Sequence, residues 1–210
     1  GRVSTGLKVA SSLDDASAFA VAQGIRAEVR ALDSVIQGLN NSKAVGKVAV
    51  AGATAVSNLM IDIRQKLTEL ANSSISASQR TIIQRDFTEL VSQAANFVSN
   101  ATYNGFALLT SGAATVNTLA NLAGGQLSLT AQGNVKLFIN SLAGATTTTA
   151  VNAQSVIVGQ FNDLETSVAQ ALGTLGAEVR ALDLQTSFLE ELRDTTTVGL
   201  GNICLLYTSD

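Results

Sequence analysis

Residues able to do chemistry are sparse in this sequence of 210 residues. It contains no histidine and a single cysteine, Cys204. Zinc sites are built mainly from histidine and cysteine, and serine or cysteine nucleophiles usually need an imidazole to take their proton. The His-Glu-x-x-His motif of zinc proteases is excluded for the same reason. We therefore expect no enzymatic activity, no catalytic residue, no metal site and no cofactor.

Paired charges are the remaining candidates for chemistry. Asp14-Asp15 could bind a cation or act in acid–base catalysis, but adjacent carboxylates also suit the positive end of a helix dipole, and we favour that structural role. Asp62 and Lys66 are spaced as an ion pair on one helix face, which stabilises a helix by only about 0.2–0.5 kcal/mol. Neither pair indicates an active site.

Composition favours long helices. Ala, Val, Leu and Ile supply most of the apolar residues, and the chain has no proline, so a helix can continue for many turns. The formal net charge is −3 and Lys and Arg are scattered, which predicts no nucleic-acid partner. No uninterrupted apolar run approaches the roughly 18 residues needed to cross a bilayer, so we expect no membrane insertion.

The longest helical periodicity follows Asp14-Asp15, either of which can cap it, and ends at Ala71. Such a helix would be about 87 Å long at 1.5 Å per residue, which is typical of a coiled coil. Its apolar residues alternate steps of three and four on both sides of a polar patch at 40–43. The residues predicted to form its seam are Ala18, Ala22, Ile25, Val29, Leu32, Ile36, Leu39, Val45, Val48, Gly52, Val56, Leu59, Ile63, Leu67 and Leu70.

Two further helices are expected. The serine-rich segment 72–78 predicts a turn, and Ser76 with Gln79 is spaced as a capping box for a helix that ends near Asn100. The short turn implies that this helix is antiparallel to the first. A third helix is expected from about Ser155, with its periodicity fading at 195–201.

The segment between the second and third helices, 103–151, predicts a small β-rich insertion. Asn104-Gly105 is a hairpin signal. Apolar and polar residues alternate around Leu127 and Leu129 and again after a turn at 131–134, so strands are expected at both places. The second of these alternations comprises Val135, Leu137 and Ile139.

A heptapeptide occurs twice: residues 27–33 and 177–183 both read Ala-Glu-Val-Arg-Ala-Leu-Asp. The repeat is either a coincidence of helix-forming composition or the mark of two helices with a similar packing role. In both copies Val and Leu fall on the apolar seam, and Arg and Asp are three residues apart on the helix surface.

Several segments resemble bacterial flagellins, in wording closest to those of alphaproteobacteria. Residues 2–9 are similar to the Arg-Leu-Ser-Ser-Gly segment of that family, and residues 13–17 to the Asp-Asp-Ala-Ala that follows it. Residues 100–109 are similar to Thr-x-Phe-Asn-Gly-x-x-Leu-Leu, and the last helix resembles the C-terminal half of the family's helical bundle. The resemblance covers about 2–106 and 161–202.

The resemblance implies a structural subunit of the flagellar filament that polymerises for swimming motility. The expected fold is mainly α, an elongated coiled-coil-like bundle of three long helices with a small β-rich insertion. Residues 1–102 would form the N-terminal helical half of the bundle, 103–152 an outward-facing insertion and 153–203 the C-terminal helix. Implied partners are other copies of the subunit, an export chaperone and the filament cap, and the implied location is the extracellular filament.

Two other interpretations remain within this resemblance. The hook–filament junction protein is a related bundle that acts as an adaptor, although the uninterrupted Tyr-Asn-Gly segment at 103–105 favours a filament subunit. A carbohydrate-binding surface flagellin would be expected to expose aromatic residues, and the insertion offers only Phe138 and Phe106 as candidates.

The chain departs from the family at both ends. Flagellins begin some tens of residues earlier and end some tens later, so the resemblance implies truncation at both termini. Residues 204–210, which begin with Cys204, have no counterpart in the family. They resemble the in-frame translation of a sequencing adapter, and we expect a non-native tail there.

One surface of the family is recognised by a Toll-like receptor through a segment similar to Arg-Ile-Arg-Glu-Leu. The corresponding residues here are Asp62, Ile63, Arg64, Gln65 and Lys66. Ile63 and Arg64 match, whereas Gln65 replaces the acidic residue and Lys66 places a charge where an apolar contact is expected. The resemblance therefore implies weak or absent receptor activation.

Overall fold

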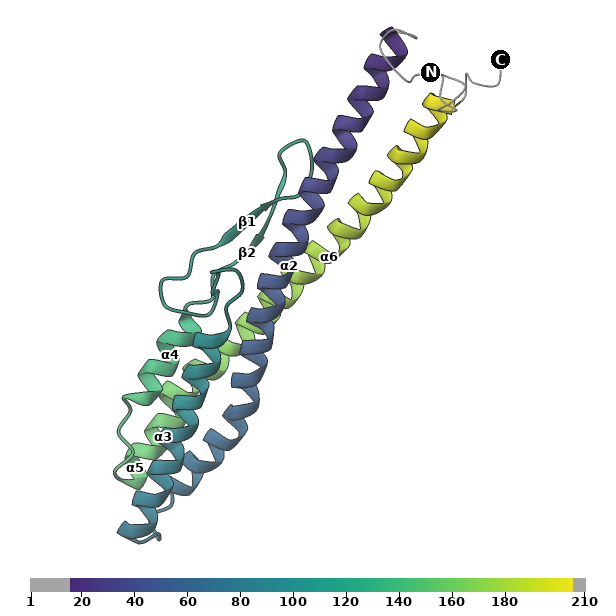
Figure 1. Cartoon of the computed structure of the whole chain (residues 1–210). Helices are drawn as coiled ribbons and strands as arrows, with labels where there is room; N and C mark the ends of the chain where they lie inside the picture. Colours follow the sequence, from purple (N-terminus) through teal and green to yellow (C-terminus); the bar gives the residue numbers. More distant parts are fainter. Residues whose placement is uncertain (1–15, 206–210) are drawn as a thin grey trace. The chain divides into compact units, whose positions relative to one another are not determined.

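The computed structural model describes residues 16–205 of the 210-residue chain. This part is mainly helical with one two-stranded sheet (Figure 1). The predicted cap at Asp14-Asp15 and the flagellin-like segment at 2–9 lie outside the described residues. In chain order the elements are α2 (Ala16–Leu70), α3 (Ala77–Asn100), β1 (Val116–Leu119), β2 (Gln126–Leu129), α4 (Asn134–Ala143), α5 (Ala150–Val156), the π-helical turn η1 (Ile157–Phe161) and α6 (Asn162–Leu205).

The described elements divide into two compact units, and each of the two long helices contributes to both. The first unit comprises residues 16–41, 118–127 and 181–205. The second comprises 42–117 and 128–180. The first unit therefore contains the start of α2, the tip of the β1–β2 hairpin and the end of α6, and the second contains all of α3, α4 and α5.

The seam predicted for the first helix is confirmed. Every predicted seam residue of α2 is buried or half-buried, because the three–four spacing keeps them on one side of the helix. The fully buried members of the prediction are Ala22, Leu32, Ile36, Leu39, Val45, Gly52, Val56, Ile63, Leu67 and Leu70.

Two side chains cap the turn between α2 and α3. The hydroxyl of Ser76 accepts a hydrogen bond from the amide of Gln79 at 3.2 Å, and the side chain of Gln79 accepts one from the amide of Ser76 at 2.8 Å, so the predicted capping box is confirmed. Arg80 closes the other side of the turn by donating to the carbonyl oxygens of Leu70 at 2.7 Å and Asn72 at 3.0 Å. Leu70 ends α2, so its carbonyl has no partner within the helix.

The predicted turn at Asn104-Gly105 is present as a tight turn without flanking strands. Asn104 has φ 52° and Gly105 has φ 81°, as a two-residue hairpin turn of the primed type requires. Tyr103 and Phe106 exchange two backbone hydrogen bonds, of 3.0 and 2.9 Å, across it. The pairing stops at this single bridge.

The strand predicted at 135–139 is wrong, because this segment is the helix α4. Val135, Ile139 and Leu142 are buried and lie four and three residues apart, whereas Leu137 is exposed. A spacing of four residues satisfies an alternating pattern as well as a helical one, so the short apolar run did not distinguish the two. The strand predicted around Leu127 and Leu129 is β2.

The count of three long helices is also corrected. Residues 16–205 contain four helices when α5, η1 and α6, which follow one another without a break, are taken as one. This last helix begins at Ala150 rather than near Ser155, and Thr149 caps it by accepting a hydrogen bond from the amide of Asn152 at 3.1 Å. It does not fade at 195–201 but continues to Leu205.

The π-helical turn has a clear cause in the spacing of buried residues. Ala153 and Val156 are buried in α5, and the next buried position is Phe161, five residues further on. An α-helix returns to the same face after three or four residues, so a five-residue step would rotate Phe161 out of the core. A turn with i→i+5 hydrogen bonds accommodates the extra residue, so that Val156 before the turn and Phe161 at its end are both buried.

One stretch of α2 is apolar and long enough to cross a membrane, judged by length and composition alone. From the sequence, only uninterrupted apolar runs were considered, and this stretch was not anticipated. A third of that stretch is buried inside the protein. Val and Ala raise the apolar content of α2, and its glycines let neighbouring segments approach the helix closely.

Two glycines mark that close approach. A Cβ at Gly46 would lie 2.5 Å from Cγ2 of Val179, and one at Gly52 would lie 2.6 Å from Cβ of Ala101 and 3.2 Å from Cδ1 of Leu109. Such distances leave no room for a methyl group, so α2 packs here through its backbone.

Replacing Gly52 with Ala should destabilise the protein. Overpacking against Ala101 costs about 1–3 kcal/mol, which outweighs the gain of about 1 kcal/mol in helix propensity. Gly38→Ala is the matched control on the same helix, because a Cβ there meets no atom within 4 Å. We expect urea unfolding to shift to lower denaturant for Gly52→Ala and to higher denaturant for Gly38→Ala. Equal shifts would contradict the close packing at Gly52.

Candidate functional site

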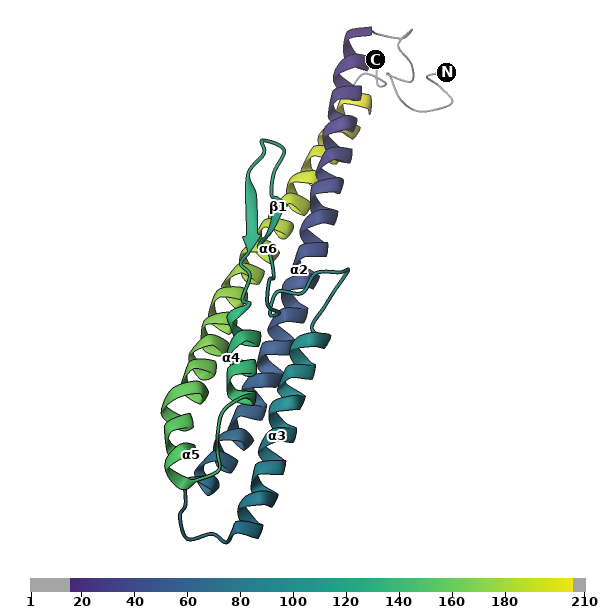
Figure 2. The same ribbon diagram turned by 90° about the vertical axis from the view of Figure 1, so that its left-hand side faces the viewer.

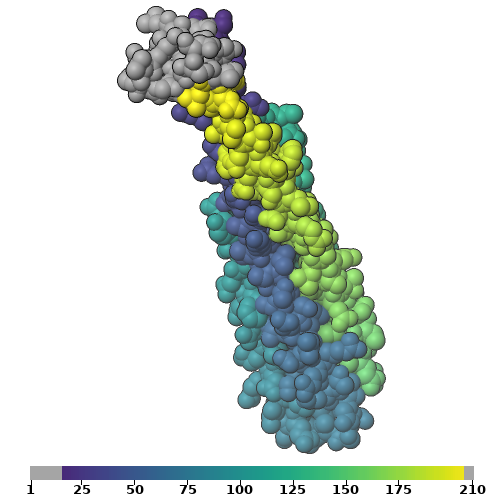
Figure 3. Space-filling view, turned by 90° about the vertical axis from the view of Figure 1, so that its right-hand side faces the viewer, coloured from purple at the N-terminus to yellow at the C-terminus, as the bar shows by residue number. Residues whose placement is uncertain are grey.

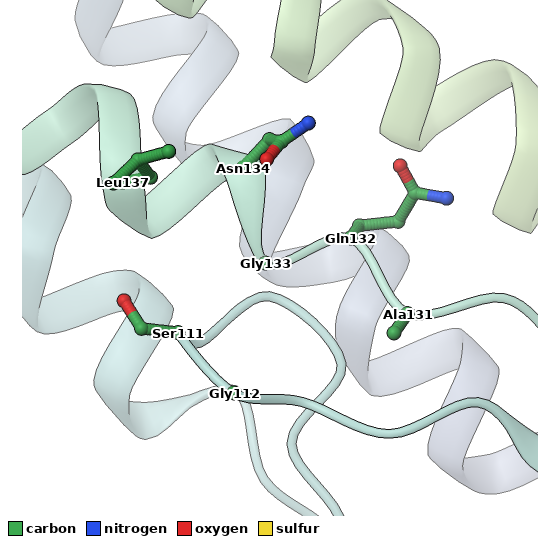
Figure 4. A pocket seen from close by; sticks show the side chains of 7 residues that line it. All are labelled: Ser111, Gly112, Ala131, Gln132, Gly133, Asn134 and Leu137. Atoms are coloured by element: carbon green, nitrogen blue, oxygen red, sulfur yellow. The ribbon is translucent and has the colours of Figure 1, made fainter.

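No cluster of three or more His, Cys, Asp or Glu side chains is placed to hold a metal ion in residues 16–205. One hollow, with a volume of about 320 Å³, lies between the loop at 111–112 and the start of α4 (Figure 4). The polar ends of Ser111, Gln132 and Asn134 do not converge on a common point there. None of the lining residues titrates near neutral pH, so this hollow offers no acid, base or nucleophile.

Backbone contacts explain why the two loops meet at this hollow. The amide of Gln132 donates to the carbonyl of Leu108 at 2.7 Å, and the amide of Lys136 donates to the carbonyl of Leu109 at 3.2 Å. The second bond satisfies an amide in the first turn of α4, which has no side-chain cap. A Cβ at Gly133 would lie 2.9 Å from the carbonyl oxygen of Thr110, so only glycine allows this approach. The hollow is therefore a by-product of loop packing.

The stretch predicted to correspond to a receptor-binding surface lies on α2 in the second unit. Its side chains divide between the core and the surface. Ile63 is fully buried, Arg64 and Gln65 are exposed, and Lys66 is half-buried. A partner that contacts this face of α2 would therefore meet Arg64, Gln65 and the end of Lys66, and would not reach Ile63.

Arg64 joins α2 to the start of α6. Its Nη1 atom lies 3.8 Å from Oε2 of Glu165, and both side chains are more than half exposed. The guanidinium carbon also lies 6.0 Å from the ring centroid of Phe161, the buried residue that ends the π turn. Stacking of this kind contributes about 0.5–1 kcal/mol at an exposed site.

Lys66 joins α2 to α3. Its Nζ atom lies 3.7 Å from Oδ2 of Asp86 and 3.6 Å from Oε2 of Glu69. The predicted pairing of Lys66 with Asp62 is wrong, because the lysine pairs with Glu69 on its own helix and with Asp86 on α3 instead. Gln65 donates to Glu69 at 3.4 Å.

Two side chains of α6 hold the ends of the β hairpin. The carboxylate of Glu178 accepts hydrogen bonds from the amide of Thr130, at 3.0 Å to each oxygen, and from its hydroxyl at 2.9 Å. The side-chain amide of Gln185 donates to the carbonyl of Ala120 at 2.6 Å. Figure 2 shows the hairpin beside α6, outside the pair of long helices. A two-stranded sheet leaves backbone groups unpaired at its ends, and these two contacts satisfy them.

Glu178 and Gln185 occupy a row of α6 that is apolar elsewhere. One row of buried residues repeats every seven positions: Phe161, Val168, Leu175, Leu182 and Leu189. A second row follows the first at a distance of three residues. Its first two members, Leu164 and Ala171, are buried, and its next two are Glu178 and Gln185. The second row becomes polar where backbone of the hairpin packs on the helix. We did not single out either residue from the sequence, although this interruption of the repeat was a usable signal.

The two copies of the heptapeptide behave alike on their apolar side and differently on their polar side. Leu32 and Leu182 are both buried, while the valine of each copy is half-buried. Glu178 binds Thr130, whereas the equivalent Glu28 is exposed and makes no such contact within the described residues. Both copies therefore turn the same apolar side toward the core.

One charged cluster lies in the first unit. Nη1 of Arg193 is 3.1 Å from Oδ1 of Asp33, and Nη2 is 3.2 Å from Oδ1 of Asp194. The hydrogen bond to Asp33, followed by that to Asp194, raises the pKa of Arg193 above its ordinary value. A raised pKa adds stability that is lost only as the pH rises through it, so Arg193 stays charged at all physiological pH values.

The end of α6 carries the single cysteine. Cys204 is buried, and Nη2 of Arg26 lies 3.7 Å from its Sγ atom. The expectation that 204–210 is a non-native tail stays a prediction.

These features define a helical structural protein whose surfaces, rather than a cleft, are its candidate functional sites. Comparison with known proteins gives the family. The N-terminal helical region of bacterial flagellin matches residues 1–115. Flagellin FljO of Caulobacter vibrioides is 25% identical over 204 residues, covering 96% of this chain and 74% of the relative. A flagellin of Brucella melitensis is also 25% identical, over 213 residues, covering 96% of this chain and 75% of the relative.

Two solved structures share the fold. A flagellin of Bacillus cereus matches with a TM-score of 0.65 at 15% identity, over 72% of this chain and 88% of that one. A putative flagellar hook-associated protein of Vibrio parahaemolyticus matches with a TM-score of 0.73 at 15% identity, over 91% of this chain and 100% of that one. Because both identities are low, these likenesses concern the fold and do not favour the junction protein over the filament subunit.

The chain belongs to the bacterial flagellins. It is a structural subunit of the flagellar filament and not an enzyme, as the sequence resemblance implied.

Replacing Glu178 with Ala should release the end of β2 from α6. Thr130 loses the bifurcated hydrogen bond of its amide and the hydrogen bond of its hydroxyl, both accepted by the carboxylate, so we expect a destabilisation of about 1 kcal/mol. Hydrogen exchange at the Thr130 amide should accelerate most. Glu28→Ala removes the same residue type from an identical heptapeptide and should leave this amide unchanged. Equal protection of Thr130 in both variants would show that the contact does not hold the hairpin.

Proposed function

We propose that this chain assembles with further copies of itself into an extracellular filament that drives swimming. The observation that carries the proposal is the match of residues 1–115 to the helical region of flagellin, together with two helices of 55 and 44 residues in the structure. Long helices with surfaces free of catalytic groups suit repeated lateral packing. The relatives named above are flagellins over 96% of this chain.

The partners proposed besides further copies are an export chaperone and the cap of the growing filament. Both follow from family membership. A flagellin must be kept from assembling before export and must be folded at the filament tip, and a separate protein can serve each need. No nucleic-acid partner and no cofactor are proposed.

We further propose that the segments 1–102 and 153–203 form the inner part of the filament wall and that 103–152 faces outward. Support comes from chain order, because the intervening segment is inserted between α3 and the last helix. The insertion contains α4 as well as β1 and β2, so its composition differs from the β-rich one expected. It also exposes Tyr103 and Phe106 at its first turn.

The apolar stretch of α2 is proposed to pack within the protein and not to enter a membrane. Its buried face contacts protein at Gly46 and Gly52, where methyl groups would not fit. The exposed side of α2 carries charges such as Lys47 and Asp62, which would be costly to place in a bilayer.

The filament proposal can be tested with a chimera. This chain would replace the aligned region of flagellin FljO in Caulobacter vibrioides cells from which the other flagellins have been removed. We expect filaments by negative-stain electron microscopy and a swimming halo in soft agar. A deletion of FljO in the same cells is the control. Secretion of the chimera into the medium without filaments would contradict the proposal.

The surface around Arg64 is proposed to be a poor ligand for the Toll-like receptor that senses other flagellins. Lys66 is held by Asp86 and Glu69, so a receptor would have to accept a half-buried charge at that position. An anchor lost at the centre of an interface can cost about 2 kcal/mol or more.

The double variant Gln65→Glu, Lys66→Leu should therefore increase receptor signalling in a reporter-cell assay by at least about tenfold, the equivalent of 1.4 kcal/mol. Lys47→Leu, which removes an exposed lysine elsewhere on α2, should leave the signal unchanged. Strong signalling by the unmodified chain, equal to that of an enteric flagellin, would refute this prediction.

A further inference from the structure

The turn that follows α3 contains a reactive pair of residues, Asn104 and Gly105. No other asparagine in the sequence is followed by glycine. The backbone nitrogen of the residue after an asparagine can attack the carbonyl carbon of the asparagine side chain, and glycine leaves that nitrogen least hindered because it has no Cβ. Both residues of the pair are exposed to solvent. The pair therefore has the local chemistry for an intramolecular reaction.

Neither reacting group is held by a hydrogen bond within residues 16–205. The two backbone bonds across the turn join Tyr103 and Phe106, at 3.0 and 2.9 Å, and involve neither the amide of Gly105 nor the side chain of Asn104. The pairing is a single bridge outside the named strands. The Asn104 side chain is therefore free to rotate toward the Gly105 nitrogen, and only two hydrogen bonds oppose the backbone adjustment that the reaction needs.

Two asparagines in other turns have side chains that are held in place. Oδ1 of Asn72 accepts hydrogen bonds from the amide of Ser74 at 3.0 Å and from its hydroxyl at 2.7 Å. Oδ1 of Asn121 accepts hydrogen bonds from the amides of Ala123 at 3.0 Å and Gly125 at 2.8 Å. These bonds would have to break before either side chain could turn to the backbone nitrogen that follows it.

Exposure alone does not make an asparagine reactive. The helix α6 lies open on the face drawn in Figure 3, and Asn202 on this helix is exposed. In an α-helix, however, each amide donates to the carbonyl four residues earlier, so the nitrogen that follows Asn202 is engaged and cannot attack. Asn104 differs because the residue after it is a glycine outside any helix.

Water has access to the turn. A hollow with a volume of about 310 Å³ lies beside it and is lined in part by Gly105, Phe106 and Thr110. One water molecule in the liquid occupies roughly 30 Å³, so the hollow has room for several. The Gly105 peptide is therefore exposed to the reactant that would open a cyclic intermediate.

We propose that Asn104 is a site of spontaneous covalent modification, where asparagine is converted to aspartate and isoaspartate. The nitrogen of Gly105 loses its proton and forms a bond to Cγ of Asn104, while the bond from Cγ to Nδ2 breaks. Ammonia leaves with the proton, and a succinimide ring remains. Water then opens the ring, giving aspartate by attack at Cγ and isoaspartate by attack at the backbone carbonyl carbon. The net change is the addition of water and the loss of ammonia, without an oxidant or a reductant.

The isoaspartate form opens the turn. Its main chain runs through Cβ and Cγ, so the turn gains a backbone atom and loses the geometry that pairs Tyr103 with Phe106. These two side chains are 42% and 46% exposed, so the change falls on an aromatic pair at the surface. The reaction also adds a negative charge to a chain whose formal net charge is −3. It needs only the folded chain and water, and so does not depend on the proposed filament function.

Peptide mass spectrometry tests the proposal, because it distinguishes asparagine, aspartate and isoaspartate at each position. The full folded chain would be incubated at mildly alkaline pH, sampled over time and digested in mild acid, where the reaction stops. We expect Asn104 to convert at least about tenfold faster than Asn72 or Asn121, which corresponds to a barrier lower by about 1.4 kcal/mol. Equal rates at the three positions would overturn the proposal.

Gly105→Ala and Gly112→Ala form a matched pair of variants. Both glycines have positive φ, 81° and 75°, and a Cβ at either would meet no atom within 4 Å, so each substitution strains its turn in a similar way. Gly112, labelled in Figure 4, follows a serine and has no asparagine to attack. We expect Gly105→Ala to slow the conversion of Asn104 at least about tenfold, because the added methyl group crowds the attacking nitrogen, and Gly112→Ala to leave the rate unchanged. A strained and loosened turn would react faster, so slower conversion cannot result from lost folding, and an unchanged rate in Gly105→Ala would overturn the proposal.

Amide hydrogen exchange tests the opening of the turn. In the isoaspartate fraction, the amides of Tyr103 and Phe106 should exchange at least about tenfold faster than in the unmodified chain. Asn104→Asp is the matched control, because it adds the same charge without the extra backbone atom and should keep both amides protected. Equal protection in the isoaspartate fraction and the unmodified chain would overturn the proposed opening.

Discussion

The close approach of neighbouring segments to α2 is the constraint on which the second unit depends. At Gly46 the helix backbone meets Val179 of α6 and Leu129 at the end of β2, and at Gly52 it meets Ala101 and Leu109. Three regions distant in sequence from this part of α2, around residues 101–109, 129 and 179, therefore close on one short stretch of helix. The chain has few aromatic residues to fill space, so dense packing has to come from small residues brought close together.

Most of the helical framework could be predicted from the sequence, because long apolar periodicity, the Ser76–Gln79 spacing and the absence of proline all act locally. The errors fell where local signals are ambiguous. In α4, a four-residue spacing fits both a strand and a helix, and only tertiary packing decides between them. The π turn was also missed, because a five-residue step between buried positions looks like an ordinary end of the pattern.

The candidate sites were less accessible from the sequence than the fold. The absence of histidine excluded most catalytic and metal chemistry at once, whereas the contacts of Glu178 and Gln185 depend on the backbone of a distant hairpin. Ion pairing was predicted from spacing on one helix, yet Lys66 is paired with Asp86 on a neighbouring helix. Spacing identifies residues that share a face, but it does not show what lies opposite that face.

The π turn between α5 and α6 has a consequence for the insertion or deletion of residues in this helix. An added residue in an α-helix normally rotates everything on one side of it by about 100°, which would expose Ala153 and Val156. Here one loosened turn accommodates the extra residue and leaves the register of α6 intact. The helix thus contains a place where its length can vary by one residue without disturbing the core.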